Sequence, residues 1–224
     1  AEERLRRARL LARKAAALTP AKDPAATLAM ALEALELVEG GSLRDRINVA
    51  VAAGSAMADF AHPRLRIPVN RALALLAERS GDRALALRGL SRLVTDHLEA
   101  GDFSEADRVL RDRDALAKSL ELPRFAWMEA LFRSMRAMAD GRFDVCDAAI
   151  KEATGLAEEL GDRGAARCIA VHRTWLGFVR DDVEAMPENA QRVLEFFRSM
   201  PAALSRVVRA TTAFRTGAME DARA

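Results

Sequence analysis

The chain has 224 residues, 50% of them hydrophobic, and its 35 basic and 33 acidic residues leave a formal net charge of +2. This near balance excludes a dedicated nucleic-acid-binding domain, which would concentrate basic residues, and no apolar run is long enough for a membrane span. Aromatic residues make up only 5% while alanine and leucine abound, which favours closely packed helices over a β sandwich. Two cysteines in no disulfide or zinc pattern, and the lack of a signal peptide, predict a cytoplasmic protein.

The N-terminal part of the chain predicts helices separated by proline and glycine turns. A basic amphipathic helix over Glu2–Leu18 could bind an anionic surface, but we prefer the interpretation that its polar face is simply solvated. Pro20 and Pro24 separate it from a second helix, and Ser42 is placed to cap a third. Pro68 lies inside the fourth helix, which predicts that this helix begins or bends there.

The rest of the chain predicts long helices joined by loops of two or three residues, which force successive helices to run antiparallel. His62-Pro63 ends the third helix, which is rich in small residues. In chain order, the expected helices are Glu2–Leu18, Ala25–Val38, Leu43–Phe60, a partner ending near Arg79, Asp82–Ala100, Phe103–Leu120, Pro123–Ala139, Phe143–Leu160, Asp162–Val179, Asp182–Met200 and Pro201–Thr216.

A repeat of about 40 residues is visible in the middle of the chain. Gly101-Asp102-Phe103 recurs as Gly141-Arg142-Phe143, and Ser80-Gly81-Asp82-Arg83 recurs two periods later as Leu160-Gly161-Asp162-Arg163. A fixed period of this size is typical of a solenoid, in which each helix pair buries its apolar face on its neighbours. Gly101 and Gly141 follow helix ends, where we expect a positive φ. The repeats start near Ser42, Asp82, Leu122, Asp162 and Pro201.

We therefore predict one helical repeat domain over residues 1–224, with an N-terminal helix pair in 1–40 and repeats in 42–216. The segment Gly217–Ala222 matches the second-helix start Gly101–Ala106 without completing the helix, so we expect a piece excised from a longer protein. Apolar residues superpose after translation by 40 residues, as buried seams require. The superposed sets are Phe103, Phe143 and Val183; Ala106, Cys146 and Met186; Leu110, Ile150 and Ala190; Leu116, Leu156 and Phe196; and Leu120, Leu160 and Met200.

Beyond the second helix, the pattern resembles the tetratricopeptide repeat family. That family's second helix begins Gly-x-aromatic-x-x-Ala, with an apolar residue four positions later. Here the signature reads Gly101–Ala106 with Leu110, then Gly141–Cys146 with Ile150, then a degenerate copy at Asp181–Met186. The usual period is about 34 residues. The longer period and the Leu-Gly-Asp-Arg junctions look like the extended variant found in large bacterial signalling proteins.

Those proteins include LuxR-type regulators related to the maltose-operon activator and signal-transduction ATPases with attached cyclase or kinase domains. The resemblance implies an all-α, right-handed superhelical solenoid of antiparallel helix pairs. It also implies a scaffold that binds a protein, a peptide or a small effector, and it implies no catalytic residues.

A metal site is the first chemical function to weigh. Cys168 and His172 lie four residues apart on one helix and share a face, and Cys146 on the preceding helix could join them to hold zinc with one open position. We prefer the alternative, in which Cys146 fills a small core position of the repeat and Cys168 is a buried apolar residue. No metal and no cofactor are therefore predicted.

No catalytic arrangement is predicted either. His62, His97 and His172 are too scattered to pair with a nucleophile, and the chain has no phosphate-binding loop of the Walker type. The acidic pairs Glu158-Glu159 and Asp181-Asp182 lie at helix ends, with no indication of a pocket that would place both groups on a substrate. We therefore expect that the chain is not an enzyme.

A binding groove is the remaining candidate, because in the tetratricopeptide family the first helix of each pair lines the concave side. Arginine combined with aromatic and methionine side chains is typical of such a lining. Taken singly, we prefer to read the apolar members as inter-helix packing and the arginines as a solvated rim. The candidates are Arg88, Arg92, Thr95, Met128, Phe132, Met135, Arg136, His172 and Trp175.

The sequence thus predicts the interaction or sensor segment of a multidomain bacterial signalling or transcription regulator. Its partner would be a protein or peptide, which could be another domain of the same chain, and neither nucleic acid nor a membrane. Two alternatives stay open: an oligomerisation scaffold that forms homo-oligomers, and a domain that binds a small-molecule effector.

Overall fold

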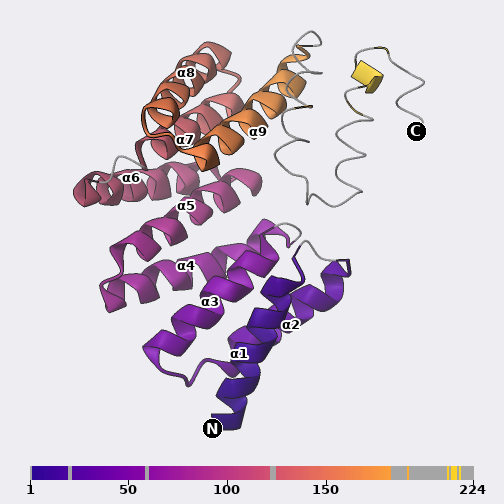
Figure 1. Ribbon diagram of the computed structural model, residues 1–224, viewed down its shortest axis with the longest axis vertical. Helices are drawn as coiled ribbons and strands as arrows, with labels where there is room; N and C mark the ends of the chain where they lie inside the picture. Colours follow the sequence, from indigo (N-terminus) through magenta and orange to yellow (C-terminus); the bar gives the residue numbers. More distant parts are fainter. Residues whose placement is uncertain are drawn as a thin grey trace. The chain divides into compact units, whose positions relative to one another are not determined.

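The computed structural model describes residues 2–19, 22–58, 61–121, 125–182, 191, 211, 213–215 and 217. Every regular element in these ranges is a helix (Figure 1), so the fold is all-α, as the sequence predicts. None of the described helices has the length and apolar character that crossing a bilayer requires. The helices are α1 Glu2–Ala17, α2 Pro24–Leu37, α3 Leu43–Met57, α4 Pro63–Ser80, α5 Arg83–Glu99, α6 Phe103–Leu120, α7 Ala126–Ala139, α8 Phe143–Glu159 and α9 Arg163–Arg180.

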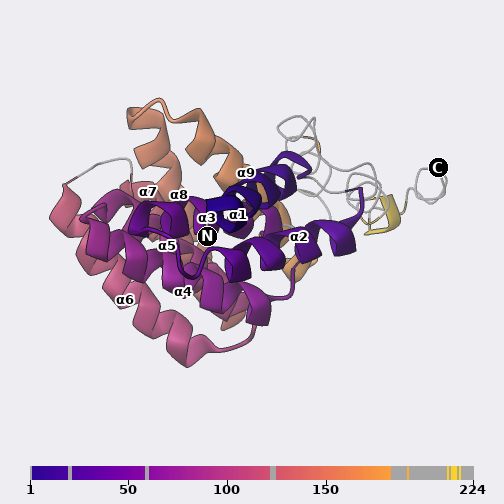
Figure 2. The same cartoon turned by 90° about the horizontal axis from the view of Figure 1, so that it is seen from below.

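The chain divides into two compact units, the N-terminal unit (residues 1–121) and the C-terminal unit (residues 122–224). In the N-terminal unit α1 packs on α2, α3 on α4 and α5 on α6, and α1 also packs on α3. Figure 2 shows α1 and α2 side by side. In the C-terminal unit α7 packs on α8, and α9 packs on both. Successive helices therefore form the pairs that the repeat predicts.

Side-chain caps fix where several helices begin. Ser42, Asp82 and Asp102 each accept a hydrogen bond from the backbone N–H three residues later, at 3.2, 2.9 and 3.3 Å. Such a cap satisfies a donor that the helix itself leaves unpaired, and it contributes about 1 kcal/mol. The cap predicted at Ser42 is confirmed.

The turn from α5 to α6 shows how one helix leads into the next. Gly101 has a φ of +74°, which glycine adopts without steric cost. The Gly101 N–H donates to the Leu98 carbonyl at 3.1 Å, and the Asp102 N–H donates to the His97 carbonyl at 2.9 Å. These two bonds close the end of α5 in a Schellman motif. Gly141 repeats the arrangement with a φ of +71°, so the prediction for both glycines is confirmed.

Small side chains fill the centre of both units. Ala8, Ala12 and Ala34 are buried together with Val49 in the N-terminal unit. In the C-terminal unit, Ala130 and Cys146 belong to a second cluster with Trp127, Leu131 and Ile150. Such short side chains let helices approach closely. A Cβ atom on Gly89 of α5 would lie only 3.0 Å from the backbone of Ala74 on α4.

The predicted seams are partly right. Ala106 and Cys146 are fully buried and Ile150 nearly so, but Phe103 and Leu160 are 38% and 41% exposed. The prediction that these two are buried is wrong because they sit at helix ends. Phe103 is the first residue of α6 and Leu160 is the residue that caps α8, so neighbouring helices do not cover them. The seam residues predicted at 183, 186, 190, 196 and 200 lie outside the described residues.

Three helix boundaries differ from the prediction by more than one residue. The helix α3 ends at Met57 instead of residue 60, and α7 begins at Ala126 instead of residue 123. The helix α4 begins at Pro63 and runs through Pro68, so a start at Pro68 is wrong. The His62 ring caps α4 by accepting the Arg64 N–H through Nδ1 at 3.2 Å, and Pro63 suits the first helical position. The helices predicted over 182–200 and 201–216 fall almost entirely outside the described residues.

Candidate binding faces

Two arginines of α5 converge on one serine of α3 in the N-terminal unit. Arg88 and Arg92 lie one turn apart, and the Nη2 atom of each donates to Ser55 Oγ, at 3.4 and 3.1 Å. The Ser55 hydroxyl donates its own proton to the Val51 carbonyl at 2.8 Å. Its oxygen therefore serves both guanidinium groups as an uncharged acceptor. We call Ser55, Arg88 and Arg92 the arginine pair site.

The charge of the arginine pair site is not neutralised within the described part of the chain. Arg88 and Arg92 form no ion pair with any described carboxylate, and Arg92 Nη1 is buried without a hydrogen-bond partner. Burial, followed by the nearby charge of Arg88, lowers the pKa of Arg92, although a guanidinium stays charged at neutral pH. Asp96 acts on Arg92 from one turn away, but its oxygens are hydrogen-bonded by Arg66 and Asn70.

Gly54 of α3 makes the space in which the Arg92 side chain lies. A Cβ atom at this position would stand 3.0 Å from Arg92 Nη1 and 3.4 Å from Asn70 Oδ1. The Asn70 oxygen is also buried without a hydrogen-bond partner. Sequence reasoning had named the two arginines but missed Ser55 and Gly54. The only sequence signal for these two residues is their small size, and the same helix contains many other small residues.

Thr95, the third candidate on α5, is half-buried. Its hydroxyl donates to the Ser91 carbonyl one turn earlier, at 3.4 Å. This bond back to its own helix occupies the Thr95 proton, and among the described residues no hydrogen bond joins Thr95 to the arginine pair site. The structure therefore brings together two of the three α5 candidates.

An apolar stripe runs along α9 in the C-terminal unit. Trp175 is 52% exposed and Val179, one turn later, is 55% exposed. The Trp175 ring meets Phe178 edge to face, with centroids 5.7 Å apart and planes at 72°, an arrangement that fixes an aromatic ring on a surface. Cys168 is exposed and Val171 half-buried, and both continue the same helical face. We call Cys168, Val171, Trp175 and Val179 the α9 stripe.

The candidates on α7 mostly contribute to packing. Phe132 is buried, Met128 packs against the core of the C-terminal unit, and Met135 is half-buried. Arg136 pairs with Asp140 one turn later on the same helix. The placement of the apolar members agrees with the preferred interpretation, inter-helix packing. Arg136 was expected on a solvated rim, and the structure shows it in an ion pair on its own helix.

His172 takes part in a buried polar chain. Its Nε2 atom lies 2.7 Å from Ser134 Oγ. Ser134 in turn makes two polar contacts with Cys146. The Ser134 hydroxyl lies 3.4 Å from the Cys146 carbonyl, and the Cys146 thiol donates to the Ser134 carbonyl at 3.3 Å. Burial lowers the pKa of His172 from 6.5 to about 4, so its ring is neutral at physiological pH.

The three residues weighed as zinc ligands do not converge. Cys146 is fully buried, as the preferred alternative predicts, but Cys168 is exposed on the α9 stripe. The prediction that Cys168 is a buried apolar residue is wrong, because it lies on the helical face that also exposes Trp175 and Val179. No three His, Cys, Asp or Glu side chains among the described residues are arranged to hold a metal ion.

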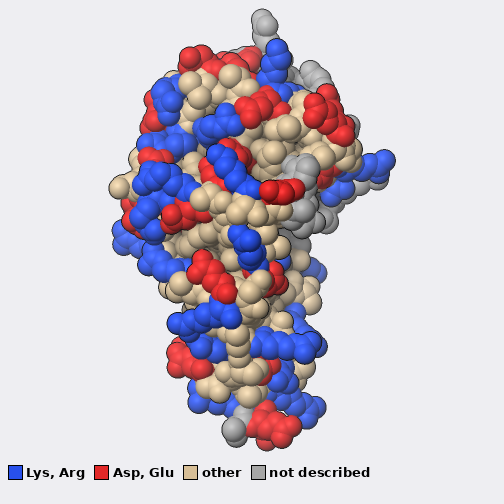
Figure 3. Space-filling view, turned by 90° about the vertical axis from the view of Figure 1, so that its left-hand side faces the viewer, with Lys and Arg blue, Asp and Glu red and all other residues tan. Residues whose placement is uncertain are grey.

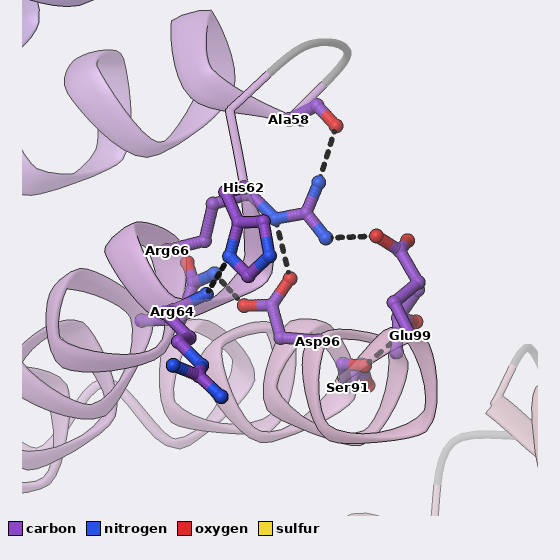
Figure 4. Close-up of polar contacts among 9 residues, drawn as sticks. Ala58, His62, Arg64, Arg66, Ser91, Asp96 and Glu99 are labelled. Carbon is purple, nitrogen blue, oxygen red and sulfur yellow. Dashed lines mark hydrogen bonds and ion pairs between the residues drawn. The ribbon is translucent and has the colours of Figure 1, made fainter. Parts of the chain in front are cut away.

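A buried ion-pair cluster joins α4 to α5, and the sequence analysis missed it. Figure 4 shows the Arg66 guanidinium between the Ala58 carbonyl, Asp96 and Glu99. Arg66 Nε donates to Asp96 at 2.8 Å and Nη1 donates to Ala58 at 3.0 Å, while Asn70 donates to the second Asp96 oxygen at 2.7 Å. Asp96 follows the buried Leu93 and Val94 and lies on the face of α5 where apolar residues recur. A charged residue on that face was the signal in the sequence for a buried ion pair.

A groove of about 480 Å³ lies between α8 and α9, but its charges cancel. Three basic residues line it together with three acidic ones, and Arg180 pairs with Asp147 at 2.7 Å. Arg173 donates to Thr154 at 3.1 Å. Basic and acidic side chains are also mixed on the face drawn in Figure 3. The groove therefore indicates no particular class of ligand.

Comparisons with known proteins bear on the fold. No protein-family model matches the sequence, and no curated protein matches it significantly. Among solved structures, aspartyl phosphate phosphatase F from Bacillus subtilis is similar over 98% of this chain and 57% of that one, with 12% identity and a TM-score of 0.68. A Rap protein complexed with competence and sporulation factor is similar over 100% of this chain and 62% of that one, with 17% identity and a TM-score of 0.67.

These likenesses establish a tetratricopeptide-like, all-helical repeat fold, as the sequence predicts. The chain spans less than two thirds of the length of either solved structure.

Proposed function

We propose that the chain is the protein- or peptide-binding segment of a larger cytoplasmic regulatory protein, and that it carries no catalysis of its own. The observation that carries this proposal is the α9 stripe. Exposed tryptophan is uncommon on a protein surface and enriched where proteins bind one another. Trp175 is exposed on α9, and its ring is held by Phe178. A partner that covers it would bury a large rigid ring at a small cost in side-chain entropy.

Two further features support binding over catalysis. One of the structurally similar proteins is described as a complex with competence and sporulation factor, which indicates that this kind of fold can hold a partner. The other structurally similar protein is named a phosphatase, but this chain spans only 57% of that protein. Two of the histidines have structural roles, because His172 is buried and bonded to Ser134 and His62 caps α4. A signalling or transcription regulator, including one of the LuxR type, remains the setting that we propose.

The proposal is tested by selecting random displayed peptides on the chain and measuring the affinity of the enriched peptides by fluorescence anisotropy. Trp175→Ala should weaken binding at least about tenfold, because truncating a central aromatic anchor costs about 2 kcal/mol or more. Leu75→Ala is the matched control, since Leu75 of α4 is also 52% exposed. It should leave the affinity unchanged.

Three outcomes would contradict the proposal. The first is that no peptide family is enriched over an unrelated helical protein, and the second is that Trp175→Ala binds like the wild type. Alternatively, light scattering across a dilution series could reveal a dimer that Trp175→Ala abolishes. In that case the α9 stripe holds a second copy of the chain, and the oligomerisation scaffold is the correct function.

A further inference from the structure

We propose that the arginine pair site binds the dianionic phosphate of a phosphomonoester carried on a partner polypeptide. The proposal rests on the proposed function only for the source of the phosphate, which is a bound partner. The phosphate-binding chemistry itself depends on Ser55, Arg88 and Arg92 alone.

The first step in the argument is convergence. The Nη2 atoms of Arg88 and Arg92 both lie within 3.4 Å of the Ser55 oxygen, so the two charged groups point at one spot. The two guanidinium groups lie at the ends of long, flexible side chains. Their like charges would repel one another if the groups did not share an acceptor. In the free chain that acceptor is a neutral hydroxyl. An anion would supply the acceptor with the charge that the hydroxyl lacks.

The second step is the charge of the ligand. Two guanidinium groups without a described carboxylate partner present about two positive charges. A carboxylate carries one negative charge, whereas a phosphomonoester carries about −1.5 to −2 at neutral pH and offers three acceptor oxygens. Arginine also binds phosphate bidentately through its planar fork. Charge and donor number therefore both match a phosphomonoester better than a carboxylate.

The third step is preorganisation. Arg92 is held in the space above Gly54, with Nη1 buried and without a partner. Fixing one guanidinium in advance reduces the entropy that ligand binding must overcome. Arg88 is exposed and can swing from Ser55 to the ligand. The site thus combines one fixed guanidinium group, that of Arg92, with one mobile guanidinium group, that of Arg88.

Competing readings of the same residues are weaker. If the arginines were only a solvated rim, Arg92 would not hold a guanidinium nitrogen out of water without a partner. If they only tied α5 to α3, one arginine on Ser55 would suffice, and a second positive charge would oppose the contact. The groove between α8 and α9 has balanced charges that select no ligand.

The experiment measures the binding of inorganic phosphate, and of a short peptide with one phosphoserine, by titration calorimetry at constant ionic strength. Acetate, and the same peptide with unmodified serine, serve as reference ligands. The test variant carries Arg88→Gln with Arg92→Gln. The control variant carries Arg79→Gln with Arg83→Gln, which removes the same charge from exposed residues of α4 and α5, one of them on the hydroxyl of Ser119.

We expect wild type and control to bind phosphate alike, and the test variant to lose at least about tenfold in affinity, since each lost charge-assisted hydrogen bond contributes on that scale. The phosphoserine peptide should bind at least about tenfold more tightly than the serine peptide. Equal phosphate affinity in the test and control variants would overturn the site. Acetate binding as tightly as phosphate would overturn the phosphate assignment, and phosphate binding without any gain for the phosphoserine peptide would overturn the polypeptide source.

Gly54→Ala provides a second test that leaves both charges in place. The added Cβ atom would push on Arg92 Nη1, the flexible end of a side chain, while alanine favours the helix by about 1 kcal/mol. This variant should fold at least as well as the wild type by circular dichroism and bind phosphate several-fold more weakly. Unchanged phosphate affinity would overturn the proposal even if the double variant failed to fold. Trp175→Ala should bind phosphate normally, which separates this test from that of the α9 stripe.

Discussion

A chain of polar contacts links three side chains inside the apolar core of the C-terminal unit: Ser134, Cys146 and His172. Each of them has a hydrogen-bond partner within this chain. Such groups are tolerated in a core only when hydrogen-bonded, because an unpaired buried polar atom costs about 1–3 kcal/mol. The neutral His172 ring fits this requirement, since it can share one proton with Ser134. A protonated ring would add a charge to a buried site without a described counter-ion.

The stability of the chain should therefore fall in mild acid. The pKa of His172 is about 4 in the folded chain and 6.5 when unfolded. Below 6.5 the unfolded chain binds a proton that the folded chain does not, so stability present at neutral pH is lost as pH falls towards 4. The expected loss from this group is about 2 kcal/mol between pH 7 and pH 5, measured by urea denaturation.

His172→Gln is the control for this prediction. Glutamine can still reach Ser134 but does not titrate, so the variant should lose less stability than the wild type over the same pH interval. Parallel loss in both proteins would mean that carboxylates, and not His172, govern the acid sensitivity. Cys146 does not titrate in this interval, because burial raises the pKa of its thiol.

At the scale of the residue, the sequence predicted which helix positions are equivalent better than it predicted what the side chains at those positions do. A translation by 40 residues carries Arg92 onto Phe132 and Phe132 onto His172. The structure gives these three equivalent positions a half-buried guanidinium, a packed ring and a hydrogen-bonded imidazole. Periodicity identifies a place on a helix, but the partner on the neighbouring helix decides what happens there. Ser55 and Ser134 are such partners, and neither stands out in the sequence.

At the scale of the element, helix bounds were predictable where a capping residue marks them. The predicted and observed bounds of α6 agree, and Asp102 caps that helix. The helix α7 starts three residues later than predicted, and Phe125 before it makes no side-chain capping bond. A capping side chain thus marks the start of α6, whereas Phe125 supplies no such cap to α7.

The contact between α4 and α5 depends on the buried Arg66–Asp96 pair. Asp96→Ala should destabilise the chain by about 3–5 kcal/mol, because it leaves the Arg66 charge buried with only the exposed Glu99 as a carboxylate partner. The measurement is the free energy of unfolding in urea at neutral pH. Burial raises the pKa of Asp96 against the opposing effect of Asn70 and Arg66, so removing the carboxylate also relieves its desolvation cost, which offsets part of the loss.

Glu105→Ala supplies the comparison for Asp96→Ala. Glu105 pairs with Arg108 on the exposed side of α6, and such surface pairs contribute less than about 1 kcal/mol. If both substitutions cost the same, the Arg66 cluster would be no stronger than a surface pair, and the contact between α4 and α5 would depend on apolar packing alone.

At the scale of the whole chain, the period of 40 residues was enough to predict an all-helical fold of antiparallel pairs. A repeat protein is held together by contacts between neighbours, so a cut between complete pairs should be tolerated. The chain divides after residue 121, next to the repeat start predicted at Leu122. What the period could not supply is the set of charged contacts, since those differ from one repeat to the next.

A fragment of residues 1–121 should accordingly fold by itself, with strong helical circular dichroism and a cooperative transition in urea. It contains the helices α1 to α6 and their cores. A fragment that ends at residue 101 lacks α6 and exposes the face of α5 that packs on it, so its transition should be broad. Equal behaviour of the two fragments would contradict a structure built from paired helices.

The glycine turns between helices have a consequence for how this chain can evolve. Gly81, Gly101 and Gly161 share one left-handed conformation, and an aspartate that caps the next helix follows each of them. Because these three joints are alike and each needs only its own few residues, a copying error that duplicates or deletes the stretch between two of them leaves a working connection behind. A chain of this kind can change its length in whole modules, and so acquire or lose a partner surface, without redesigning the modules that remain.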